Sequence, residues 1–452
     1  MANVTPIFKK GDRCDRMNYI PVSITSVVCR IMEKIIRNIL LRHLTQNGLF
    51  SKHQHGFIPN KSCTTNLLES VDLITFELWK GNCIDIVYTD FSKAFDRVNH
   101  RKLLKKLESY GIKGNLLKWI ESFLSGRKQR VVLGHSKSEW LNVTSGVPQG
   151  SVLGPLLFAL FINDLPDRFK NVCSLYADDC KIYCIFNEQN RDCSIEQLQS
   201  DIDNLTQWCN EWSMDLNIDK CEVIHIGRNN PESEYFMFKN DRFHRLSKTT
   251  EQRDLGVILT GDMKWSKQVS TSAGRANRIL GRILNGLRNH GKEIIKKMYT
   301  SLVRPHLEYA VSVWNPSLKK DIDILERVQR RATRSIHGFR KFEYVERLKR
   351  LKLTNLTTRR RRGDLIQMYK LLNKQDHVNW YKRWENDETV NRIYETRGNR
   401  YKLRRELVKN CAPRFNFFTN RIVNDWNGLT NEVIESKSIN IFKTNLDKLL
   451  KD

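Results

Sequence analysis

Two adjacent carboxylates, Asp178 and Asp179, stand in the tetrad Tyr176-Ala-Asp-Asp179 between two short apolar runs. The runs, 172–175 and 182–186, are typical of the two strands of a hairpin. Like charges side by side repel each other, and Gly or Asn suits a tight turn better. Divalent cations that neutralise the pair would explain it, although most Asp pairs are only solvated turn residues.

A third carboxylate, Asp90, follows the run 83–89 (CIDIVYT), which is typical of a buried strand. A strand-terminal Asp beside a hairpin carboxylate pair is the arrangement that two-metal phosphoryl transfer needs. One Mg²⁺ would activate an attacking hydroxyl and the other would stabilise a leaving pyrophosphate, with waters and phosphates completing their shells. Alternatively, Asp90 is the N-cap of the next helix and Asp96 is a plain turn residue.

A loop rich in Gly and Pro, 144–155 (TSGVPQGSVLGP), lies between these carboxylates in the chain. Its three Gly and two Pro predict an ordered loop with special backbone angles. Such a loop lets a backbone approach a nucleotide closely, and Gln149 could touch a base or a sugar. Taken alone, the loop could also be no more than a tight connection.

The composition indicates an anionic partner. The 452 residues include 77 Lys and Arg against 50 Asp and Glu, a formal charge of +27. Nucleic acid is the first candidate for such a surplus and an anionic membrane surface the second. No apolar run reaches the roughly 18 residues of a membrane span, and we see no signal peptide. The eleven scattered cysteines suit reduced thiols in an intracellular protein, and we expect Cys180, Cys184 and Cys193 to be buried hydrophobic residues.

The periodicity predicts alternating strands and helices in the first half and helices in the second. Helices are expected at 64–79, 100–110, 116–124, 151–165 and 194–212, and strands at 83–89, 128–133, 140–143, 222–226 and 254–259. From about residue 266 the pattern is helical and increasingly basic. The stretch 327–362 holds fourteen Lys or Arg against two Glu.

The order of these blocks and their amino-acid sequences resemble the reverse transcriptases of non-LTR retrotransposons, especially the jockey-like group. Residues 90–96 resemble motif A, 145–155 motif B and 176–179 motif C, and the three together in this order are highly specific. Further blocks resemble the fingers (5–12, 18–29, 54–57 and 61–63), motif D (216–221), the primer grip (254–257), and the thumb and tail (303–310, 314–316 and 415–426).

The resemblance implies an α/β right-hand polymerase with an α+β palm. The expected division is fingers at 1–82, palm with a fingers insertion at 83–265, a helical thumb-like domain at 266–375 and a basic C-terminal extension at 376–452. The reverse transcriptase core would cover about residues 1–260.

The resemblance also implies roles for single residues. Asp90 and Asp178 would be the main ligands of two Mg²⁺ ions, with Mn²⁺ as an alternative metal and Asp179 as an assisting ligand. Phe95 would lie under the sugar of the incoming nucleotide and select dNTPs, unless it is an ordinary core residue. The remaining expected contacts are Gln149 and Gly150 to the template–nucleotide pair, Lys220 as proton donor to pyrophosphate, and Lys9, Lys10 and Lys61 to template or triphosphate; each of these lysines could instead be merely solvated.

The implied activity is RNA-directed DNA synthesis, in which a DNA primer 3′-hydroxyl is extended with dNTPs on an RNA template. The basic thumb-like helices would hold the RNA–DNA duplex, while the run 359–362 (RRRR) could instead be a nuclear localisation signal. We expect work in the nucleus, assembly with RNA in the cytoplasm and no membrane partner; protein partners are unknown from the sequence.

The chain departs from the family at Ile20, where Arg is usual, and we expect neither an upstream endonuclease domain nor a zinc knuckle. These departures leave open a catalytically inactive, truncated remnant that only binds nucleic acid. A group II intron maturase is a further alternative, which the amino-acid sequences of the thumb and tail blocks disfavour.

Overall fold

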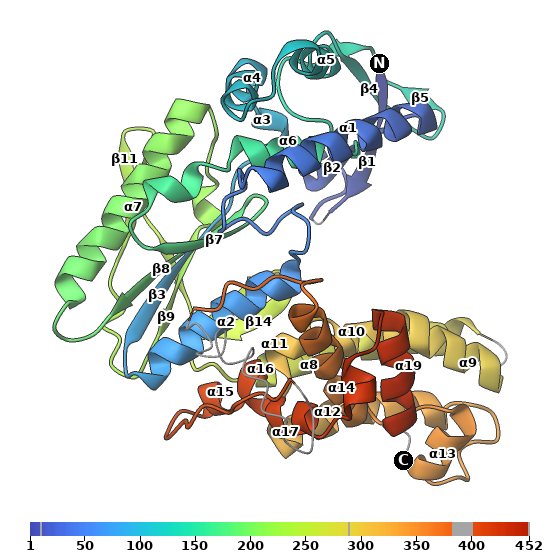
Figure 1. Cartoon of the computed structure of the whole chain (residues 1–452). Helices are drawn as coiled ribbons and strands as arrows, with labels where there is room; N and C mark the ends of the chain where they lie inside the picture. Colours follow the sequence, from blue (N-terminus) through green and yellow to red (C-terminus); the bar gives the residue numbers. More distant parts are fainter. Residues whose placement is uncertain (10, 288–289, 382–400, 451–452) are drawn as a thin grey trace. The chain divides into compact units, whose positions relative to one another are not determined.

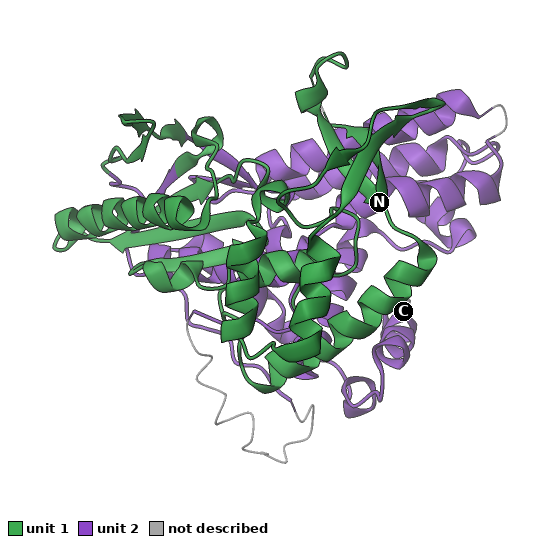
Figure 2. Cartoon of the chain, turned by 90° about the horizontal axis from the view of Figure 1, so that it is seen from above, with its two compact units in different colours: residues 1–59, 85–223, 231–248 green, residues 60–84, 224–230, 249–452 purple. Residues whose placement is uncertain are grey.

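The structure is a computed structural model that describes residues 1–9, 11–287, 290–381 and 401–450. The chain forms two compact units, shown in Figure 2. The first contains residues 1–59, 85–223 and 231–248, and the second contains 60–84, 224–230 and 249–452. Lys10, one of the expected phosphate contacts, lies outside the described residues. The division into fingers, palm, thumb and extension stays a prediction.

A five-stranded sheet carries the predicted carboxylates (Figure 1). Its order is β12 (Ser247–Thr249), β9 (Glu222–Ile226), β3 (Cys83–Thr89), β8 (Asp179–Phe186) and β7 (Val172–Tyr176). The predicted strand 83–89 is confirmed with the same bounds, because an unbroken buried run ends at the polar Asp90. Helix α7 (Arg191–Trp212) packs on β8 through buried apolar side chains, among them Leu198, Ile202 and Leu205.

A second sheet of the first unit has the order β2 (Tyr19–Ile24), β1 (Ala2–Phe8), β4 (Lys128–Leu133) and β5 (Ser136–Lys137), and β6 (Leu141–Asn142) also pairs with β4. The predicted strand pair 128–133 and 140–143 is therefore confirmed, with a shorter second strand. The helices of this unit include α1 (Val27–Gln46), α3 (Ala94–Arg97), α4 (His100–Ser109), α5 (Gly114–Leu124) and α6 (Gly154–Phe161).

Three details of the sequence prediction are wrong. Helix α6 is shorter than 151–165, because residues 151–153 still belong to the loop and the chain passes into a 3₁₀ turn at Leu165–Arg168. The run 254–259 is a hairpin of β13 (Glu251–Asp254) and β14 (Val257–Thr260), since Leu255 and Gly256 both have positive φ, 43° and 90°. Cys193 is exposed in the first turn of α7, whereas Cys180 and Cys184 are buried as expected.

The second unit is mainly helical. Its larger helices are α2 (Cys63–Trp79), α8 (Ser266–Gly286), α12 (Lys319–Arg334), α13 (Tyr344–Leu351), α14 (Leu356–Leu372) and α19 (Ile439–Leu449). Helix α2 packs against the short helices α11 (Val311–Trp314) and α15 (Ala412–Phe415). No described helix is both long enough and apolar enough to cross a membrane.

Candidate active site

Two neighbouring strands bring Asp90 and Asp178 to the same end of the sheet. Asp90 directly follows β3, and Asp178 lies in the two-residue turn between β7 and β8. The Thr89 hydroxyl donates to the carbonyl oxygen of Cys180 at 3.3 Å, which joins the end of β3 to the start of β8. The first central residue of the turn, Ala177, has a φ of +55°, as a tight primed turn requires.

The two carboxylates interact electrostatically. Burial raises the pKa of Asp178 above its ordinary value, and the nearby charge of Asp90 raises it further, while Lys9 and Lys220 act in the opposite direction. Asp179 is the first residue of β8 and is exposed. Within the described part of the chain, no three His, Cys, Asp or Glu side chains converge closely enough to hold a metal ion. The structure thus brings Asp90 and Asp178 together, and the role of Asp179 as an assisting ligand stays a prediction.

Lys220 contacts Asp90 directly, a pairing that the sequence did not indicate. Its ammonium lies 2.8 Å from Asp90 Oδ2, and about half of the lysine side chain is exposed. The segment before it is held by the chain around Asp90, because the Asn217 N–H donates to the Asp90 carbonyl at 2.8 Å. Phe91 and Leu216 form an antiparallel bridge in the same place. Lys220 is therefore positioned by backbone pairing and not only by its charge.

Phe95 is half-buried in an aromatic stack. Its ring stacks on Phe158 of α6 with centroids 4.5 Å apart, and it meets the edge of Phe57 at 6.3 Å. Its carbonyl accepts from the Val147 N–H at 2.8 Å, which ties it to the Gly- and Pro-rich loop. One face of the Phe95 ring packs on α6, and the residue is still partly exposed. Phe95 can therefore be a packing residue and also contact a nucleotide.

The loop 144–155 is docked on β2 and α1. The Ser23 N–H donates to the Gln149 carbonyl at 2.8 Å. Gly150 has a φ of +103°, and a Cβ there would lie 2.4 Å from the Ser23 carbonyl oxygen, so only glycine fits. At the other end of the loop, the buried Glu33 Oε2 accepts from the Val152 and Leu153 N–H groups at 2.7 and 2.9 Å. Glu33 thus orients the loop, a role that sequence reasoning missed.

A second missed residue, Gln54, supports the turn itself. Its side-chain oxygen accepts from the backbone N–H groups of Ala177 at 2.9 Å and Gly56 at 2.7 Å. The only signal in the sequence is the block 54–57 (QHGF). Its sequence resembles the fingers of the family and does not indicate a contact with the tetrad 176–179.

The remaining predicted residues are Lys61, Lys9 and Ile20. Lys61 belongs to the second unit, where burial lowers its pKa and the charge of Glu69 partly offsets that effect. Lys9 is exposed. Ile20 lies on β2 opposite Ile7, with 37% of its surface exposed. The role of Lys61 toward template or triphosphate stays a prediction.

Comparisons with known proteins identify the family of this chain. Residues 7–259 match the family described as reverse transcriptase (RNA-dependent DNA polymerase). The chain is 28% identical over 357 residues to the RNA-directed DNA polymerase from mobile element jockey of Drosophila funebris, covering 75% of this chain and 37% of that protein. It is 25% identical over 356 residues to the probable RNA-directed DNA polymerase from transposon BS of Drosophila melanogaster, covering 74% and 38%.

The chain spans less than two-fifths of the length of these two relatives. Among solved structures, telomerase from Candida tropicalis in complex with a fragment of telomeric RNA matches with a TM-score of 0.42 and 10% identity. That match covers 82% of this chain and 57% of the telomerase chain.

Proposed function

The chain belongs to the reverse transcriptase (RNA-dependent DNA polymerase) family, and from this membership we propose that it is the RNA-directed DNA polymerase of a non-LTR retrotransposon. It extends the 3′-hydroxyl of a DNA primer with dNTPs on an RNA template. The observation that carries the proposal is the pair Asp90 and Asp178 at the ends of two neighbouring strands, with Lys220 bound to the first.

The donor set fits a divalent cation. Burial, and secondarily the charge of Asp90, raises the pKa of Asp178, so a cation bound beside this carboxylate would stabilise its ionised form. Asp90 and Asp178 would hold Mg²⁺, with Asp179 as a third ligand, and waters and substrate phosphates would complete the shell. Two such ions, when bound, supply activation of the primer hydroxyl and stabilisation of the pyrophosphate charge.

The protein's own side chains position the substrates. Phe95, held by Phe57 and Phe158, presents an aromatic ring against which a ribose 2′-hydroxyl would clash. Gly150 has no side chain, so the backbone of the loop can approach the nucleotide closely. Gln149 beside it contacts the template–nucleotide pair. Lys220 gives up its hydrogen bond to Asp90 and donates a proton to the departing pyrophosphate.

Primer extension with the purified chain, an annealed RNA template and DNA primer, dNTPs and Mg²⁺ tests the proposal. We expect synthesis, and we expect Asp178→Asn to reduce it at least about a hundredfold, a typical effect of removing one electrostatic contact to a transition state. The matched control is Asp192→Asn, because Asp192 lies on α7 with its side chain 84% exposed and should leave the rate unchanged. Absence of synthesis by the unaltered chain would refute the proposal.

The same preparation separates the enzyme from an inactive remnant. A remnant would bind nucleic acid with a steep salt dependence and extend no primer. Equal synthesis by the unaltered chain and Asp178→Asn would instead show that the reaction occurs at another site.

A further inference from the structure

The run of four arginines, 359–362, is already engaged inside the second unit. Each guanidinium on α14 contacts a polar or acidic side chain from another element, and Arg360 is only 2% exposed. Their partners are, in order, Glu308, Asn315, Asp425 and Asp447. This run therefore stabilises the fold, and the basic residues that are free to bind an anion lie elsewhere.

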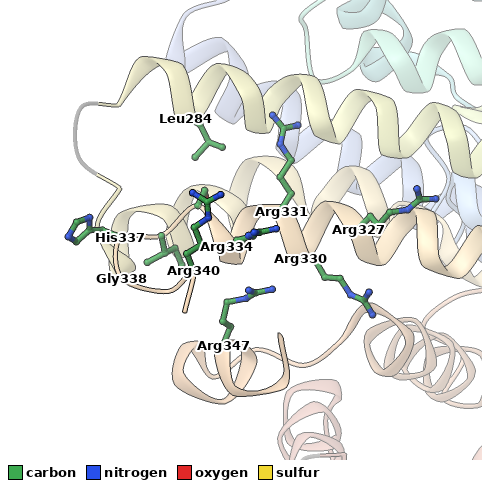
Figure 3. A pocket seen from close by; sticks show the side chains of 11 residues that line it. Leu284, Arg327, Arg330, Arg331, Arg334, His337, Gly338, Arg340 and Arg347 are labelled. Atoms are coloured by element: carbon green, nitrogen blue, oxygen red, sulfur yellow. The ribbon is translucent and has the colours of Figure 1, made fainter. Parts of the chain in front are cut away.

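A hollow of about 900 Å³ lies on the same unit, between α8, α12 and α13. Six arginines line it, and Figure 3 shows their side chains grouped around it. We call this group the arginine pocket; it consists of Arg327, Arg330, Arg331, Arg334, Arg340 and Arg347. The hollow is also lined by Leu284, Ser335, Ile336, His337 and Gly338, and no carboxylate contributes to it.

The charges of the arginine pocket are not neutralised within the described residues. The stretch 327–362 contains fourteen basic residues. None of the six arginines of the pocket makes an ion pair in the part of the chain that the structure describes. Their hydrogen bonds go to neutral groups: Arg331 donates to Asn277 Oδ1 at 3.1 Å and Arg347 to the Phe342 carbonyl at 3.2 Å. Like charges held together in this way favour binding of an anion.

Arg347 is the most informative member. It is 7% exposed, and its Nε has no hydrogen-bond partner among the described residues. Figure 3 shows its side chain extending from α13 toward Arg330 and Arg334 on α12. Tyr344 helps to fix two of these groups, because the guanidinium carbons of Arg330 and Arg347 lie 5.0 and 5.6 Å from its ring centroid. A buried donor without a partner is costly, and a ligand oxygen would satisfy it.

The size and chemistry of the hollow identify the ligand class. Guanidinium groups match phosphate oxygens in a bidentate geometry. Cavities of about 300–1,000 Å³ enclose a group the size of a nucleotide, whereas a duplex is too wide to enter one. An unpaired strand can turn single phosphates inward and stack its bases on aromatic or guanidinium planes.

We propose that the arginine pocket binds phosphates of an unpaired nucleic-acid strand. This inference does not depend on the proposed polymerase activity, because it rests on the charge, burial and shape of the pocket alone. RNA and DNA present the same phosphates, so the experiment includes a strand of each kind.

The test measures fluorescence anisotropy of a labelled uridine decamer RNA and of its thymidine DNA counterpart with the full chain. Excess unlabelled primer–template duplex occupies any duplex-binding surface. We expect the double variant Arg334→Glu/Arg340→Glu to bind the strand at least about tenfold more weakly, since the loss of one charged hydrogen bond already weakens binding by about that factor. The slope of log K against log salt should fall in magnitude by about 1.4, at about 0.7 per lost phosphate contact.

Lys349→Glu is the matched control, because Lys349 is an exposed residue of α13 that does not line the hollow. It reverses one charge, where the double variant reverses two, and should alter the affinity less than twofold. Arg334→Gln/Arg340→Gln, with thermal melting followed by circular dichroism, covers the case in which charge reversal impairs folding. The proposal fails if the double variants bind like the control, or if duplex displaces the labelled strand.

Discussion

The side-chain oxygen of Gln54 accepts a 2.9 Å hydrogen bond from the backbone N–H of Ala177, in the turn that carries Asp178. The loop around Gln54 also pairs with the strand before the turn, since the Leu175 N–H and carbonyl bond to His53 and His55 at 2.9 Å. The conformation of the turn is thus maintained by a segment more than 120 residues away in the chain. The role proposed for Asp178 requires such support, because small displacements of a catalytic group reduce the rate.

Gln54→Leu should therefore destabilise the turn. The substitution introduces an apolar side chain of similar size and removes the acceptor shared by the Ala177 and Gly56 N–H groups. We expect the free energy of unfolding in urea to fall by about 1–3 kcal/mol, and kcat of primer extension to fall more than the dNTP affinity. Gln207→Leu on the exposed face of α7 is the control and should change the free energy of unfolding by no more than about 0.5 kcal/mol. Equal effects of the two substitutions would contradict the supporting role of Gln54.

Gly150→Ala should be more harmful than a glycine substitution at another positive φ in open space. Both Gly150 and Gly134 have positive φ, +103° and +58°, but only Gly150 has a neighbour where a Cβ would lie, the Ser23 carbonyl oxygen at 2.4 Å. Gly134→Ala is expected to cost about 1–2 kcal/mol from backbone strain alone. Gly150→Ala should cost more in urea unfolding and should lower primer extension, because the loop has to move away from β2. A Gly150→Ala protein as stable as Gly134→Ala would disprove this close packing.

Local features of the fold were predictable because they depend on neighbouring residues. The strand 83–89 is an uninterrupted buried run, and α7 shows a regular apolar face. The hairpin within 251–260 was missed although Gly256 interrupts the apolar run, which is a signal for a turn. The meeting of Asp90 and Asp178 followed from motif order, since neither the spacing nor the periodicity specifies that β3 and β8 are adjacent.

Long-range polar contacts were not predictable from the sequence. Lys220 and Asp90 are 130 residues apart, and Gln54 and Ala177 are 123 apart. Hydrogen bonds of this kind leave no periodic pattern, because they depend on the tertiary arrangement of segments that each look unremarkable. The run 359–362 is a further example, because its sequence does not show that α14 directs its members to partners on other helices.

The stability of the unit that contains Asp178 should depend on pH through this carboxyl group. Burial, and secondarily the charge of Asp90, raises the pKa of Asp178 above its ordinary value of 3.8. The folded state therefore binds this proton more tightly than the unfolded state, so this group's contribution to the free energy of unfolding increases as the pH falls through the folded-state pKa. The unfavourable contribution is fully present at neutral pH and disappears as the pH approaches 3.8.

In EDTA, Asp178→Asn should consequently be more stable than the unaltered chain at neutral pH, and its advantage should shrink toward about pH 4. Urea unfolding of both proteins at several pH values measures the difference between their free energies of unfolding. The contributions of the other carboxylates cancel in this difference. Added Mg²⁺ should stabilise the unaltered chain and not the variant, because only the former keeps both ligands. An advantage that is the same at every pH would show that Asp178 titrates normally.

Arg414→Met should destabilise the second unit through Asp72 on α2. The guanidinium Nη1 lies 2.6 Å from Asp72 Oδ1, and the two side chains are 1% and 2% exposed. Burial raises the pKa of Asp72, and Arg414 is the charge that most opposes this increase. Removing the arginine leaves Asp72, and also Glu406 at 2.6 Å from Arg414 Nε, without a charged partner, at an expected cost of about 3–5 kcal/mol in the free energy of unfolding.

The double variant Arg414→Met/Asp72→Leu should regain much of this loss, because replacing both charges with apolar groups is often nearly neutral. Arg404→Met, an exposed arginine in the same part of the chain, provides the control for the loss of one positive charge. Urea unfolding of the unaltered chain, Arg414→Met, Asp72→Leu and the double variant measures the coupling between residues 72 and 414. A double variant no more stable than Arg414→Met would show that Asp72 does not account for the loss, and α2 would then not depend on this ion pair for its place in the second unit.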